Sequence, residues 1–168
     1  MIEELRSSTG LPLERDELRA LVARVAARPE LWRPHWDPRA TERTYAALHR
    51  DDDVDLWALF WRPAHDTGWH DHDTSSGAVQ VVEGVLEEHA LLIAEPERRT
   101  RYHAGEAFTF GPSHIHRVTC ASAHAVSIHA YSPPLWRLGQ YTVAPDGALH
   151  RMSVSYADEL RPLELDAA

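Results

Sequence analysis

Two histidines spaced two residues apart are the residues of this chain best placed to do chemistry. His70 and His72 flank Asp71, and alternate residues of a β-strand project from one face, so both imidazoles can reach one metal ion. A third histidine from another strand would complete one triangular face of an octahedron. The remaining positions would be open to a substrate and O2 together, as in mononuclear iron oxygenases. The spacing therefore indicates metal-centred redox chemistry.

The third imidazole has two candidate positions. His114 and His116 also lie two residues apart and would share a strand face, so spacing alone leaves both open. A single His-x-His pair is a weak signal, because histidines are common on protein surfaces. The metal interpretation therefore depends on the residues that surround the pair.

A second alternating pattern lies later in the chain, at Ser127, His129 and Tyr131. These three polar side chains share one face of the expected strand, while apolar residues between them fill the other face. Polar groups on an inward face are costly unless they are hydrogen-bonded. A relay from serine to imidazole to phenol would satisfy them and direct the Tyr131 hydroxyl toward the metal. The alternative is an outward polar face of an edge strand.

Composition narrows the function classes. The chain has 168 residues and a net charge of −9, which offers no electrostatic basis for binding nucleic acid or an anionic membrane. It contains no apolar run of membrane-spanning length, and its N-terminus lacks the apolar core of a signal peptide. The single cysteine, Cys120, is consistent with a reducing cytoplasm. All basic residues are arginine, which excludes lysine-based catalysis.

The residue pattern predicts one domain over residues 1–168, with a helical region over residues 1–50 and a β-barrel over residues 53–155. An apolar stripe predicts a helix over residues 13–27, and Asp37-Pro38 resembles the start of a second helix that runs to about His49. Short segments separated by Gly, Pro and Asp predict an all-β barrel with the helices packed outside. The expected strands are residues 54–61, 78–83, 85–93, 107–110, 116–119, 125–131, 138–143 and 149–154.

The surroundings of the histidines resemble the two conserved motifs of the cupin superfamily. Gly77 and Gly84 follow the His-x-His pair at the expected distances, and Gly105 and Gly111-Pro112 precede the third histidine. The resemblance implies a cupin jelly-roll barrel. In many cupins a glutamate is a fourth ligand, and Gly77 stands in its place here. Three neutral histidines would leave a bound Fe(II) with its full charge, which favours an anionic substrate such as a thiolate.

Over residues 40–145 the chain resembles the cysteine dioxygenase family. The matching motifs are Leu59-Phe60-Trp61, His116-Arg117-Val118 and the string from Ser127 to Pro134. The resemblance implies that His116 is the third ligand and that His114 is a neighbour of the site. It also implies an enzyme that uses Fe(II) at His70, His72 and His116 to insert both atoms of O2 into a small-molecule thiol. Tyr131, oriented by His129 and Ser127, would contact the reacting oxygen or the substrate.

The sequence departs from the family in two places. Animal relatives carry a cysteine at the position of Gly77 that crosslinks to the tyrosine, so no such thioether can form here. Relatives acting on cysteine bind its carboxylate with an arginine; with Tyr45 as the reference, that position is Ala47. Arg43 or Arg50 would then have to meet the carboxylate, or the substrate is another thiol. Ergothioneine is one candidate, since aromatic faces bind quaternary ammonium groups and tryptophans are frequent here, at positions 32, 36, 57, 61 and 69.

Two other functions stay open at this stage. One is a cupin dioxygenase that acts on a non-thiol substrate such as a diketone, and the other is a non-catalytic metal-binding sensor. Sensors of this kind usually accompany a DNA-binding domain, and the N-terminal helices contain no basic recognition helix. We expect a monomer or a small homo-oligomer.

Overall fold

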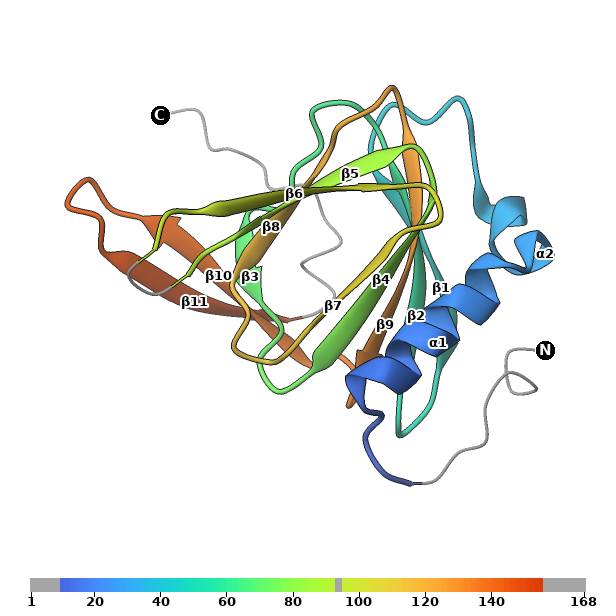
Figure 1. The fold of residues 1–168 in the computed structure, drawn as a ribbon, viewed down its shortest axis with the longest axis horizontal. Coiled ribbons are helices and arrows are strands. Elements are labelled where there is room, and N and C mark those ends of the chain that lie inside the picture. The colour runs from blue at the N-terminus through green and yellow to red at the C-terminus, as the bar shows by residue number, and fades with distance from the viewer. Residues whose placement is uncertain (1–9, 93–94, 156–168) are drawn as a thin grey trace.

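The computed structural model describes residues 10–92 and 95–155, and in this part of the chain two antiparallel sheets face each other with helices outside one of them (Figure 1). This arrangement confirms the predicted cupin jelly-roll barrel. The five-stranded sheet has the order β1 (Thr44–Arg50), β2 (Asp55–Trp61), β9 (Ala125–Ser132), β4 (Ser76–Glu83) and β7 (Ala107–Phe110). The six-stranded sheet has the order β11 (Leu149–Ser155), β10 (Arg137–Val143), β3 (Trp69–Asp71), β8 (His116–Cys120), β5 (Val85–Ala90) and β6 (Arg98–His103).

Strand β2 is buried along its whole length because each of its faces packs against a different core. Trp57, Leu59 and Trp61 point into the barrel, whereas Leu56 and Phe60 belong to the cluster beneath the helices. Strand β9 pairs with β2 over its whole length and divides its side chains in the same way. Ser127, His129 and Tyr131 of β9 lie on the barrel side, whereas Val126, Ile128 and Ala130 pack in the cluster beneath the helices.

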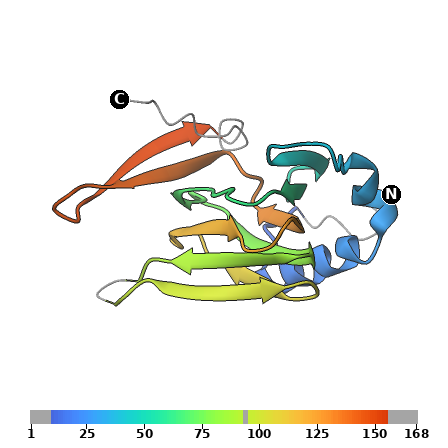
Figure 2. The same cartoon turned by 90° about the horizontal axis from the view of Figure 1, so that it is seen from above.

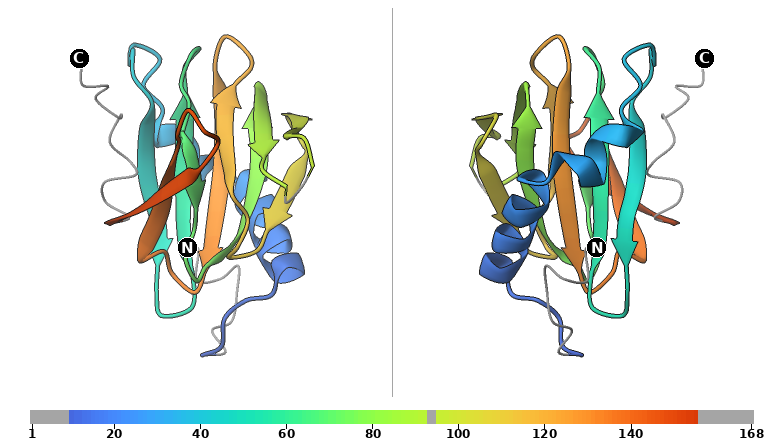
Figure 3. Two further views of the ribbon diagram at one scale, coloured as in Figure 1. Left: turned by 90° about the vertical axis from the view of Figure 1, so that its left-hand side faces the viewer. Right: turned by 90° about the vertical axis from the view of Figure 1, so that its right-hand side faces the viewer.

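Helix α1 (Arg15–Ala26) covers the outer face of the five-stranded sheet and contacts β4, β9 and β7 (Figure 3). Its buried stripe consists of Leu18, Leu21, Val22 and Val25, the apolar periodicity of an amphipathic helix. It begins at a capping box in which the Glu17 carboxylate accepts the backbone N–H of Glu14 at 2.8 Å. A short helix α2 (Pro29–Trp32) and a single 3-10 turn (Arg33–His35) follow. None of the helices in the described ranges is long and apolar enough to cross a membrane.

The prediction of a second helix from Asp37 to about His49, and with it a helical region that extends to residue 50, is wrong. Residues 44–50 form strand β1. Asp37 makes a turn, in which its carboxylate accepts the backbone N–H of Arg39 at 2.9 Å. Residues 44–50 form a strand because they pair with the edge of β2 in an antiparallel ladder. The hydrogen bonds and packing of this ladder outweigh the weak local preference for a helix.

Two strands of the six-stranded sheet were missing from the expected strand ranges, although the spacing of His70 and His72 had placed both on a strand. Strand β3 has only three residues, and β6, with the sequence Arg-Arg-Thr-Arg-Tyr-His, has no apolar alternation. Both are strands because their neighbours offer backbone partners. The end of the expected strand at residue 93 lies outside the described residues. Figure 2 shows that the β10–β11 hairpin extends past the strands beside it, so β11 is an outer edge of the molecule.

The seam between α1 and the five-stranded sheet generates a stability prediction. Replacing Leu21 by Ala leaves a cavity in a fully buried cluster, and we expect the free energy of unfolding to fall by about 2–5 kcal/mol. Urea denaturation followed by circular dichroism measures this change. Arg19→Ala on the exposed face of the same helix is the matched control and should shift it by less than about 0.5 kcal/mol. Equal effects for the two variants would contradict the packing described.

Candidate metal centre

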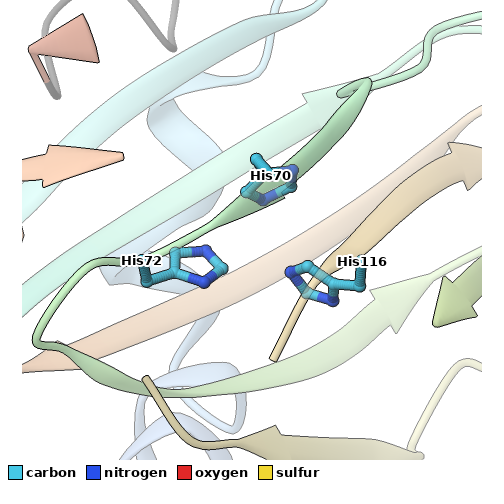
Figure 4. A group of neighbouring side chains, drawn as sticks. All are labelled: His70, His72 and His116. Carbon is cyan, nitrogen blue, oxygen red and sulfur yellow. The ribbon is translucent and has the colours of Figure 1, made fainter. Parts of the chain in front are cut away.

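Three histidine rings converge between the two sheets (Figure 4). His70 on β3 and His116 on β8 are directly paired across the ladder, and His72 follows the last residue of β3. The ring centroids are 4.7 to 5.2 Å apart, and one nitrogen of each ring lies within 4.8 Å of the other two. This arrangement is the triangular face that the sequence spacing predicts.

The three rings are buried and suited to hold a metal. His72 Nδ1 and His116 Nε2 have no hydrogen-bond partner among the described residues, although buried polar atoms are normally paired. Burial lowers the pKa of His72 well below its ordinary value and that of His116 to about 3. The His72 and His116 rings are therefore neutral near pH 7 and keep the lone pairs that a metal ion requires.

Hydrogen bonds to the far side of two rings decide which nitrogen faces the centre. His70 Nδ1 donates to the Gly68 carbonyl at 3.0 Å, and His116 Nδ1 donates to the Glu88 carboxylate at 2.8 Å. Each Nδ1 therefore carries the proton, and each Nε2 is left as a ligand atom. These outer partners orient metal-binding histidines in the manner common to protein metal sites.

Glu88 is a site residue that sequence reasoning missed. It lies on β5, is buried, and its Oε1 accepts hydrogen bonds from both His116 and His114. His114 is therefore hydrogen-bonded to the Glu88 carboxylate and is not one of the three converging rings. Burial raises the pKa of Glu88, but the two imidazole donors outweigh it and lower the pKa to about 2. The only available signal was an acidic residue within a segment otherwise expected to be a buried strand.

Gly77 makes room for an aromatic ring beside the centre. It is paired with Phe110 on one side and Tyr131 on the other, and a Cβ at Gly77 would lie 2.2 Å from Phe110 Cζ. The Phe110 ring stacks on His72 with centroids 4.5 Å apart. The space that a crosslinking cysteine would need is thus filled by a phenyl ring that packs on a candidate ligand.

Ser127, His129 and Tyr131 form a hydrogen-bonded chain on the inner face of β9. Ser127 Oγ lies 2.8 Å from His129 Nε2, and His129 Nδ1 lies 3.1 Å from the Tyr131 hydroxyl. Trp61 on β2 joins the chain through an indole N–H that donates to Ser127 Oγ at 2.8 Å. The Tyr131 ring stacks on His72 at 5.1 Å between centroids, so the chain ends beside the three histidines.

The Trp61 indole fixes one end of this chain, because Trp is a donor only and occupies one of the two acceptor sites of the Ser127 oxygen. The Ser127 hydroxyl keeps its hydrogen and a second acceptor site, so its bond to His129 Nε2 is compatible with either neutral tautomer of the ring. Burial, and after it the charge of Arg43, lower the pKa of His129 to about 3, which keeps the ring neutral. In the tautomer with the proton on Nδ1, His129 donates to the Tyr131 oxygen at 3.1 Å, and the Tyr131 hydrogen is directed to another acceptor.

Asp71, between the two histidines of β3, anchors that strand from its other face. Its carboxylate accepts two hydrogen bonds from Arg151 at 2.8 and 2.9 Å and one from Tyr141 at 2.5 Å. Burial raises the pKa of Asp71, but Arg151 and Tyr141 hold it below its usual range. Gly139 allows the close approach, because a Cβ there would meet the Arg151 guanidinium and the Asp71 carboxylate. The β10–β11 hairpin thereby ties down the strand that carries His70 and His72.

The residues considered for substrate contact line the edge strand β1. Tyr45 and Ala47 are paired with Leu59 and Trp57, so they share the barrel-side face of the sheet. Tyr45 is exposed and packs edge-on against Trp57. Arg43 precedes the strand on the same side, with its guanidinium 5.4 Å from the Trp61 ring centroid.

Arg50 is committed elsewhere. Its guanidinium binds the buried Asp55 carboxylate at 2.6 Å and the Leu135 carbonyl at 3.1 Å. Of the two arginines considered as replacements for a residue at position 47, Arg43 is the one whose charge acts on His129, where it lowers the pKa of the ring.

The tryptophans do not gather into one cage. Trp32 and Trp36 belong to the core beneath the helices, and Trp69 lies under the Arg117 guanidinium. Trp57 and Trp61 alone among the five face the barrel interior. The three histidine rings line a cavity, and its lining among the described residues consists of apolar groups, aromatic rings, imidazoles and one threonine, without a carboxylate.

Comparison with known proteins identifies the family. The family model of cysteine dioxygenase type I matches residues 10–143, most of the chain. The chain belongs to the cysteine dioxygenase type I family. The matched region contains the three histidines, the hydrogen-bonded chain of β9 and Tyr45. Family and fold together indicate an oxidoreductase of the cupin dioxygenase class with a metal ion at the histidine site.

Solved structures show the same fold at low sequence identity. A Klebsiella pneumoniae protein with a double-stranded β-helix domain is 13% identical with a TM-score of 0.52, covering 71% of this chain and 91% of its own. A cupin superfamily protein from Desulfitobacterium hafniense is 10% identical with a TM-score of 0.52, covering 76% of this chain and 98% of its own. A recombinant oxalate oxidase bound to glycolate is 13% identical with a TM-score of 0.51, covering 60% and 56%.

The contact of Gly77 with Phe110 generates a prediction. Gly77→Ala places a methyl group inside the Phe110 ring volume, and we expect a loss of about 1–3 kcal/mol in the free energy of unfolding. Gly111→Ala is the control, since no atom lies within 4 Å of its added Cβ, and it should unfold like the wild type. Thermal denaturation of both variants measures the difference. A Gly77→Ala protein as stable as the control would show that the ring moves aside at little cost.

Proposed function

We propose that the protein is an Fe(II)-dependent thiol dioxygenase that inserts both atoms of O2 into a small thiol to give a sulfinate. The observation that carries the proposal is the donor chain from Trp61 to Tyr131, which ends against His72 of the three-histidine centre. One thiol and one O2 give one sulfinic acid, so the substrate supplies all the electrons and no further reductant is needed.

We infer different roles for the residues of the centre. His70, His72 and His116 would hold the iron, which when bound supplies the place where thiolate and O2 meet and exchange electrons. Tyr131 would donate its hydroxyl hydrogen to the reacting oxygen or the sulfur. In the tautomer protonated on Nδ1, His129 would hold that hydroxyl in one orientation, with Ser127 and Trp61 completing the chain behind the ring.

The substrate class follows from the charges around the cavity. Arg43 offers a cation on the side of Trp61, and the cavity lining offers no carboxylate for an ammonium group. The scattered tryptophans give no support to a betaine such as ergothioneine. We therefore infer a small thiol with a carboxylate and no amine, such as 3-mercaptopropionate, with Tyr45 and Arg43 at its polar end.

The ligand set generates the next prediction. Single replacements His70→Ala, His72→Ala and His116→Ala should each reduce bound iron to less than about one tenth of an equivalent, because two imidazoles hold iron far more weakly than three. Tyr131→Phe is the matched control: it should retain one equivalent and lose about 10²-fold in kcat. Metal analysis after anaerobic loading and desalting gives the iron content. A histidine variant that keeps stoichiometric iron removes that residue from the ligand set.

The proposed substrate is tested by turnover. With Fe(II)-loaded protein in an oxygen electrode, we expect 3-mercaptopropionate to exceed L-cysteine, cysteamine and ergothioneine in kcat/KM by at least about tenfold. The product should gain two oxygen atoms by mass. Arg43→Met should lower kcat/KM for 3-mercaptopropionate by about 10- to 100-fold and leave cysteamine unaffected.

Other results of the same assay point to other functions. If cysteine is the best substrate, another group binds its carboxylate in place of the arginine that the family has at the position of Ala47. Turnover of a diketone without turnover of thiols would identify a cupin dioxygenase of another class. Stoichiometric iron without any O2 consumption would favour a metal-binding sensor.

A further inference from the structure

The ligand set of the centre contains no negative charge. Gly77 contributes no side chain, and the three ligand atoms that converge on the centre all belong to imidazoles. A divalent ion held by three neutral imidazoles keeps its full charge inside a low-dielectric cavity, which is unfavourable unless an anion lies nearby. The carboxylate of Glu88 is in direct contact with one of the ligands, 2.8 Å from His116 Nδ1.

Strand register brings Glu88 to this place. Leu86, Glu88 and Ala90 alternate on the inward face of β5, and Ala90 is paired with His116 on β8. The Glu88 side chain is thus directed at the back of the His116 ring. Its residue exposure is 3%, so the carboxylate is removed from water as completely as the rings it serves.

The hydrogen-bond donors to Glu88 among the described residues are two imidazoles and a phenol. Oε1 accepts His116 Nδ1 at 2.8 Å and His114 Nε2 at 2.9 Å, and Oε2 accepts the Tyr102 hydroxyl at 3.4 Å. Burying a carboxylate without an arginine or lysine partner costs desolvation free energy, and the cost is larger if the carboxylate also loses its hydrogen-bond partners. A metal ion on the far side of His116 would offset this cost.

We propose, on the basis of the three-histidine centre described above, that Glu88 is a positioning residue that supplies the negative charge the ligand set lacks. It holds His116 in the tautomer that presents Nε2 to the metal. Through that hydrogen bond it also increases the electron density of the imidazole and partly balances the charge of the ion. His114, stacked against Phe110 with centroids 5.9 Å apart, keeps Glu88 in place with a second hydrogen bond.

A second metal ion on Glu88, His114 and His116 is the competing interpretation, because these three also bring ligand atoms within 4.8 Å of one another. Short hydrogen bonds from both imidazoles to the same Oε1 argue against it. A metal there would have to displace the proton on His116 Nδ1, and that proton is what orients the ring toward the first centre.

Glu88→Gln and Glu87→Gln provide a matched pair of variants for the test. Both remove one negative charge from β5, but Glu87 faces outward and pairs with Arg101 at 2.6 Å. Competition with a coloured chelator under anaerobic conditions gives the Fe(II) dissociation constant. We expect one equivalent in the wild type, about 10- to 100-fold weaker binding in Glu88→Gln, and a change of less than about twofold in Glu87→Gln.

Two further measurements separate positioning from a structural role. Loss of the buried charge should raise the Fe(III)/Fe(II) midpoint potential of Glu88→Gln, because an anion stabilises Fe(III) more than Fe(II). The metal-free Glu88→Gln protein should unfold at the same temperature as the metal-free wild type or higher, because a buried charge is gone. A lower unfolding temperature with unchanged iron affinity would make Glu88 a packing residue and overturn the proposal.

The remaining outcomes are distinct from one another. If Glu88→Gln binds iron as tightly as Glu87→Gln and at the same potential, the proposal for Glu88 is wrong while the three-histidine centre stands. Two equivalents in the wild type and one in Glu88→Gln would assign Glu88 to a second metal site instead. A wild type that binds no iron under any condition would remove the centre itself, and with it the proposed function.

Discussion

The pairing of β3 with β8 is the contact on which the rest of the site depends. It sets His70 opposite His116 across one rung of the ladder, and His72 follows at the end of β3. A strand of three residues has few hydrogen bonds of its own to keep it in register. The Asp71–Arg151 ion pair on its outer face supplies that restraint and joins the ligand strand to the β10–β11 hairpin.

Burial of polar groups is the second constraint, and the site meets it by giving each group a defined partner. The chain from Trp61 to Tyr131 gives four buried side chains hydrogen-bond partners in sequence. On the opposite sheet, His70 and His116 are turned by the Gly68 carbonyl and Glu88. Pre-oriented dipoles of this kind stabilise reacting charge without having to rearrange during the reaction.

The charges around the centre are distributed in an unusual way. In the described part of the chain no carboxylate lines the cavity, the buried Glu88 contacts the far side of the His116 ring, and Arg43 lies on the side of Trp61. A divalent ion at this centre would keep part of its positive charge, and an anionic substrate would neutralise that remaining charge. Selectivity for anions then follows from the ligand set as well as from the residues at the mouth of the cavity.

The sequence by itself determined the fold class, helix α1, most strands, and the shared faces of His70 with His72 and of Ser127 with Tyr131, because these depend on local periodicity and spacing. It did not determine β1, where pairing with β2 overrode local helix signals, or the short β3. Only the tertiary structure brought Glu88 against His116 and Arg151 against Asp71. Those contacts join residues 28 and 80 positions apart, and strand register, which no local pattern encodes, decides which side chains meet.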